Sequence, residues 1–119
     1  MKKESVLREK SYRFAVRVVR LSQFLKNDKK EYILYKQILR SGTAIGALIC
    51  EAEYAQSTAD FINKFNVSLK EANETAYWLS LLKDTDYIDS NLYTSFFQDC
   101  DELICILVST IKTLKAKNS

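Results

Sequence analysis

The sequence predicts an all-α protein, an antiparallel up-down-up-down four-helix bundle, and three observations support this prediction. Of the 119 residues none is proline and only two are glycine, which argues against folds that need many tight turns. Apolar residues recur at helical spacing along four segments of the chain. The connections between these segments are short, so consecutive helices are expected to lie antiparallel.

The first helix is predicted over about residues 5–26, and the second over about residues 30–56. Asp28 is expected to cap the second helix, with Glu31 three residues later, as in a capping box. The expected core residues of the first helix are Leu7, Phe14, Val18, Leu21 and Leu25. Those of the second are Tyr35, Ile38, Gly42, Ile45, Ile49 and Ala52.

Both glycines, Gly42 and Gly46, fall inside the second predicted helix. A glycine in a helix interior costs about 1 kcal/mol relative to alanine. We expect close approach of another helix to offset this cost. A phosphate-binding loop is the alternative, but it would need a preceding strand and a fuller glycine pattern.

The third and fourth helices are predicted over about residues 58–84 and 91–115, the third capped by Ser57 and Asp60. Together the four helices predict a single domain over residues 1–119. Residues 54–57 contain neither glycine nor proline, so one continuous helix across this junction stays open. An open pair of helical hairpins that associates between chains is the alternative architecture.

The first helix carries more apolar surface than one core-facing stripe requires. Tyr12, Val16 and Val19 lie outside that stripe and extend the apolar arc beyond half the circumference. We interpret this excess as a surface for self-association through the first two helices. The alternative is that the wide face packs against two neighbours within one bundle.

Positive charge is concentrated at the start of the chain. The net charge is +3, but residues 1–40 hold twelve basic and four acidic residues. Lys10, Arg13, Arg17 and Arg20 form a stripe on the first helix, which Arg40 extends from the second. Such a stripe predicts contact with the phosphates of RNA or DNA. The alternative is a solvated face neutralised by Glu9 and by acids of the third and fourth helices.

The residues that catalysis usually requires are missing. No histidine is present, which removes the commonest general base and the histidines of di-iron bundles. Cys50, Cys100 and Cys105 lack paired spacing and are expected to be buried thiols. The sequence predicts no enzyme, metal site or cofactor. Without a long apolar run or a signal-peptide core, we expect a cytoplasmic protein and no membrane contact.

Two segments, residues 40–61 and 70–87, resemble a bacterial family of four-helix-bundle proteins. It includes the protein encoded in intervening sequences of 23S ribosomal RNA genes, also called S23 ribosomal protein. It also includes the accessory variability protein of diversity-generating retroelements. The resemblance rests on Arg40, Ser41, Gly42, Thr43, Ile45, Gly46, Ala47, Ile49, Glu51, Ala52, Ser57, Ala59, Asp60, Phe61, Glu71, Ala72, Glu74, Thr75, Trp78 and Leu79.

The resemblance implies a bundle that assembles into a homopentameric ring. The retroelement relatives bind a reverse transcriptase and nucleic acid through a basic surface. Ala44, Leu48 and Cys50 depart from the family pattern and make the second helix less polar. The resulting hypothesis is a non-enzymatic oligomer that binds RNA or DNA backbone in a ribonucleoprotein or reverse-transcriptase-associated assembly. A protein-protein interaction scaffold without a nucleic-acid role is the alternative.

Overall fold

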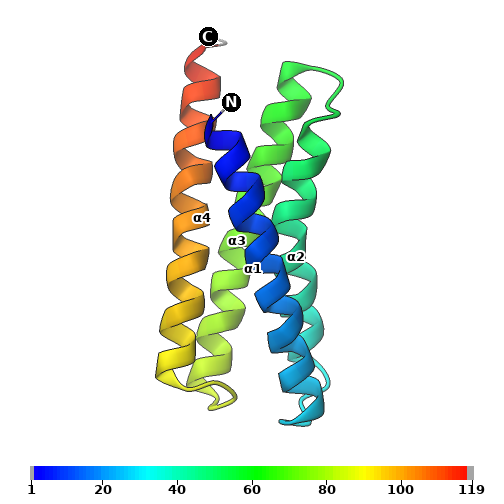
Figure 1. The fold of residues 1–119 in the computed structure, drawn as a ribbon, viewed down its shortest axis with the longest axis vertical. Helices are drawn as coiled ribbons and strands as arrows, with labels where there is room; N and C mark the ends of the chain where they lie inside the picture. Colours follow the sequence, from blue (N-terminus) through cyan, green and yellow to red (C-terminus); the bar gives the residue numbers. More distant parts are fainter. Residues whose placement is uncertain (1, 118–119) are drawn as a thin grey trace.

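The computed structural model describes residues 2–117, and these form four helices: α1 (Lys2–Asn27), α2 (Leu34–Ala52), α3 (Thr58–Asp84) and α4 (Ser90–Lys117). The helices run alternately in opposite directions, so α1 begins at the end of the molecule where α4 finishes (Figure 1). Each helix contacts the two beside it, and α1 and α4 close the ring. The predicted antiparallel four-helix bundle is confirmed. The predicted domain covered residues 1–119, of which Met1, Asn118 and Ser119 lie outside the described residues.

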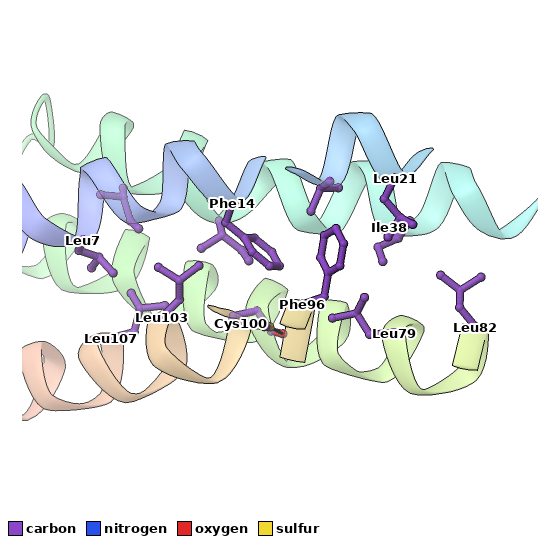
Figure 2. Close-up of a cluster of buried hydrophobic side chains, with 14 of the residues drawn as sticks. Leu7, Phe14, Leu21, Ile38, Leu79, Leu82, Phe96, Cys100, Leu103 and Leu107 are labelled. Atoms are coloured by element: carbon purple, nitrogen blue, oxygen red, sulfur yellow. Dashed lines mark hydrogen bonds between the residues drawn. The ribbon is translucent and has the colours of Figure 1, made fainter. Parts of the chain in front are cut away.

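The core runs along the bundle axis and takes residues from all four helices (Figure 2). Every residue predicted for the core side of α1 is buried, with at most 4% of its surface exposed. At the centre, the Phe14 ring and the Phe96 ring of α4 pack edge to face, with 6.2 Å between their centroids. Burying one such side chain contributes about 1.5–3 kcal/mol, so this stripe largely fixes how α1 sits on the bundle.

Several buried polar groups form hydrogen bonds from one helix to another. Ser68 of α3 donates a hydrogen bond to the Ile45 carbonyl of α2 at 2.9 Å. The hydroxyls of Thr75 and Ser41 lie 2.9 Å apart and join the same two helices. The Cys100 thiol donates to a carbonyl of α3 at 3.3 Å, and burial raises its pKa to about 12. These bonds fix the register of α3, because sliding it would leave buried polar groups unpaired.

The start of α2 differs from the prediction. Lys30 adopts a left-handed conformation, with φ 56°, so the chain turns there and α2 begins only at Leu34. The Glu31 carboxylate, 6% exposed, accepts hydrogen bonds from the backbone N–H groups of residues 33, 34 and 35 at 2.7–3.0 Å. The capping box built on Asp28 is therefore wrong. Glu31 itself satisfies the N–H groups that a helix start leaves unpaired.

The junction between α2 and α3 is a turn, which excludes one continuous helix. α2 ends at Ala52, and the N–H groups of residues 53, 54 and 55 then bond to carbonyls three residues back. The cap predicted for α3 is present. The Ser57 hydroxyl accepts from the Asp60 N–H at 3.0 Å, and the Asp60 carboxylate accepts from the Gln56 N–H at 3.2 Å.

Candidate functional site

Gly42 and Gly46 are buried where α2 faces α1, and they let the two backbones approach closely. A Cβ atom on Gly42 would lie 2.8 Å from both γ carbons of Val18. A Cβ atom on Gly46 would lie 3.1 Å from the Ser11 hydroxyl oxygen. The close approach expected of the two glycines therefore occurs between α1 and α2 of the same chain. The helix-propensity cost of both glycines is incurred at this one interface.

On its outer side the α1/α2 interface opens into a groove of about 880 Å³, which we call the outer groove. Its lining is mostly apolar, from Tyr12, Ala15, Ala47 and their neighbours. Tyr12 is 71% exposed, although it belongs to a helix with a well-filled core side. Val19 is 40% exposed and Val16 is half-buried, so the excess apolar arc of α1 faces outward in the single chain.

The three thiols have different surroundings. Cys100 is buried, as expected, but Cys50 and Cys105 are exposed, so the prediction for these two was wrong. Cys50 follows the buried Ile49, and the 100° rotation per residue turns it into the outer groove. Apolar neighbours in the sequence do not show which face of the helix a cysteine occupies.

Most of the predicted basic stripe is paired with acidic residues. Lys10 lies 3.2 Å from Glu102, Arg13 lies 2.5 Å from Glu9, and Arg17 lies 2.7 Å from Asp99. The pairs formed by Lys10 and Arg17 span the α1/α4 interface. The alternative interpretation, a face neutralised by acidic residues, therefore holds for these three cations, because each has a carboxylate at ion-pair distance.

Arg40 lies apart from the α1 stripe, at the α2/α3 interface. Its guanidinium donates to Glu71 at 3.2 Å and also to Glu74, and the bond to Glu74 is the main cause that raises the pKa of Arg40. Glu74 accepts a further hydrogen bond from the Trp78 indole at 3.0 Å, and this bond, with Arg40, lowers the pKa of Glu74. The two sequence segments that carry the family resemblance therefore meet at this network.

Positive charge without an ion pair collects near the C-terminal end of α1. Within residues 2–117, Arg20, Lys26, Lys29 and Lys30 form no salt bridge, and all four are exposed; we call them the basic end. Lys26 lies over the Tyr35 ring and Lys29 over the Phe24 ring, at 5.9 and 5.7 Å from the centroids. The sequence indicates a positive face over the first third of the chain that includes these three lysines, but of the four cations only Arg20 was among the candidate binding residues.

Acidic and cysteine side chains do not gather into a metal site. In the described part of the chain, no three of them come together in a way that could hold an ion. Glu71 and Glu74 serve instead as partners of Arg40. Among residues 2–117, no helix has both the length and the apolar character to cross a membrane.

Comparison with known proteins identifies the family. A family model described as 23S rRNA-intervening sequence protein matches residues 3–109, which include the outer groove, the Arg40 network and the basic end. The chain belongs to this family. It is also similar to a protein with unknown function from the S23 ribosomal protein family of Bacteroides thetaiotaomicron, known from a crystal structure. The two are 57% identical, with a TM-score of 0.91 over 92% of this chain and 98% of the other. No curated protein matches the chain.

Proposed function

We propose that the chain is a non-catalytic bundle that assembles with copies of itself through the outer groove. The observation that carries this proposal is the apolar groove itself, with Tyr12 71% exposed at its side. Each Å² of apolar surface removed from water contributes about 25 cal/mol, so covering the groove favours association. Its small residues, Ala15, Gly46 and Ala47, leave room for a helix of another copy.

The family resemblance implies five copies. In a ring each groove would meet a different surface of the next copy, since a cyclic assembly larger than a dimer uses head-to-tail contacts. Arg8, Glu9 and Arg13 lie along the groove and provide a polar rim around its apolar floor. An apolar centre with a polar rim is the usual anatomy of a protein interface.

Ala47→Glu places a charge in the groove and tests the assembly. We expect the wild-type chain to behave as a pentamer in light scattering coupled to size exclusion, and Ala47→Glu to behave as a monomer with unchanged helix content. Tyr77→Glu is the matched control, because Tyr77 is 61% exposed on α3, outside the groove. A wild-type protein that stays monomeric at micromolar concentrations would rule the assembly out.

A second role, binding of RNA or DNA phosphates, is supported by the basic end. Its four cations have no carboxylate at ion-pair distance within the described residues, so their charge is available to an anion. A ring would repeat this charge once per copy and bind backbone without base specificity. The name of the family links it to the 23S rRNA gene. A ribonucleoprotein or a reverse-transcriptase-associated assembly is the setting that we propose.

The salt dependence of binding tests this second role. Each phosphate contact contributes about −0.7 to the slope of log K against log salt for a single strand. Replacing Lys26, Lys29 and Lys30 by glutamine should flatten that slope. Arg13→Gln should change it much less, because Arg13 is paired with Glu9. If the wild-type chain binds no RNA or DNA at low salt, a protein-interaction scaffold is the role that remains.

A further inference from the structure

α1 and α4 come close to each other at fewer positions than the other pairs of neighbouring helices do. Near the basic end their interface opens into two adjoining hollows. The first, of about 300 Å³, lies beside Arg17 and Arg20 and has an apolar floor that includes Leu21 and Phe96. The second, of about 260 Å³, lies beside Lys29. Phe24 and Leu92 line both hollows, so the two hollows adjoin at these side chains.

Arg17 forms a fixed wall of the first hollow. Its guanidinium bonds to Asp99 at 2.7 Å and to the Ser95 hydroxyl at 2.9 Å. It also lies over the Phe96 ring, 4.1 Å from the centroid. These contacts hold its plane in place before any ligand arrives, which lowers the entropy cost of binding beside it.

Arg20 differs from Arg17 because it is exposed and forms no ion pair within residues 2–117. The carboxylates nearby have other partners or face the other hollow. Asp99 pairs with Arg17, Asp89 accepts from the Leu92 N–H at 2.8 Å, and Asp86 lines only the second hollow. The first hollow therefore combines an apolar, partly aromatic floor with one cation free to bind an anion.

We propose that this first hollow binds one nucleotide unit, with the base against Phe24 and Leu92 and the phosphate on Arg20. The inference rests on the proposed phosphate-binding role and specifies its ligand as unpaired nucleotides, because a base inside a duplex is not free to enter. The volume suits one ring system rather than a helix of a partner protein. The lysines of the basic end continue beyond the hollow and would contact the neighbouring phosphates of a strand.

The test measures binding of a labelled oligouridylate and of a matched strand without bases, by fluorescence anisotropy on the full chain. Phe24→Leu removes the ring but keeps apolar volume, so the fold is preserved. We expect it to weaken binding of oligouridylate about 5- to 150-fold, the range for losing one base–aromatic stack. The wild type should lose a similar factor on the baseless strand, whereas Phe24→Leu should bind both strands equally. Tyr77→Leu, on α3, is the aromatic control.

Arg20→Ala tests the phosphate contact separately and should reduce the slope of log K against log salt by about 0.7. Uridine monophosphate, added as a competitor, shows whether the hollow also binds a free nucleotide, which would displace the strand, or binds a nucleotide only as part of a strand. Either result supports the proposal. If Phe24→Leu and the baseless strand change nothing while Arg20→Ala acts, the nucleotide site is wrong but phosphate binding stands. If the wild type binds no strand at low salt, both proposals fail and the two hollows are left to a partner protein.

Discussion

The two sides of α1 are held to the bundle by different physics. Toward α2, the glycines bring backbones so close that a single added methyl group would meet Val18 at 2.8 Å. Toward α4, the long side chains of Lys10 and Arg17 reach across to Glu102 and Asp99 instead. Close packing allows only one spacing between two helices, whereas ion pairs between long side chains allow that spacing to vary. The first side suits a fixed assembly surface, and the second suits a ligand.

Gly42→Ala should break the close side and have the largest effect. Alanine is the better helix former by about 1 kcal/mol, but its Cβ would overlap both γ carbons of Val18. We expect a net loss of about 1–3 kcal/mol in the free energy of unfolding, measured in urea. Val18→Ala combined with Gly42→Ala should recover part of that loss. A single variant as stable as the wild type would contradict the close-packing interpretation.

Arg17→Ala tests the bridged side and should cost less, about 1 kcal/mol, because the pair is partly exposed. The loss includes the contact with the Phe96 ring, worth about 0.5–1 kcal/mol at exposed sites. A double-mutant cycle with Asp99→Ala isolates the ion pair. Its coupling energy should shrink when the salt is raised, whereas the loss in Gly42→Ala should not. Equal salt dependence in both variants would remove the contrast between the two sides.

Glu74→Gln concerns the α2/α3 interface and should have the smallest effect at neutral pH. Hydrogen bonds from Trp78 and Arg40 hold the pKa of Glu74 below its ordinary value of 4.5. Its ionised form therefore stabilises the fold above about pH 4.5, and this contribution is lost as the pH falls through the lowered pKa. Melting temperatures of wild type and variant should converge on acidification. A constant difference down to low pH would show that ionisation of Glu74 does not matter.

The core could be predicted from the sequence because helical periodicity reports directly which side chains share a face. This worked for Leu7, Phe14 and Val18, which are all buried. It failed for Glu31, since its role depends on the left-handed turn at Lys30, which no periodicity encodes. It also failed for Cys50, whose apolar neighbours face the core while the thiol itself does not.

The candidate site was less predictable, because a charge can be located on a helix without knowing what faces it. The sequence placed Arg17 on α1 correctly, but its partner Asp99 lies 82 residues away. The pairing of Arg40 with Glu74 likewise depends on how α2 and α3 pack. The free cations of the basic end became visible only after the paired ones had been subtracted.

The long separation between Arg17 and Asp99 also bears on the order in which the bundle forms. Contacts between consecutive helices are local in sequence, whereas the α1/α4 interface must close a loop that includes α2 and α3. We expect that interface to form after the transition state for folding. Arg17→Ala should then accelerate unfolding while leaving the folding rate almost unchanged in a chevron plot. The α1/α4 interface would thus set the lifetime of the folded state rather than the rate at which the chain folds.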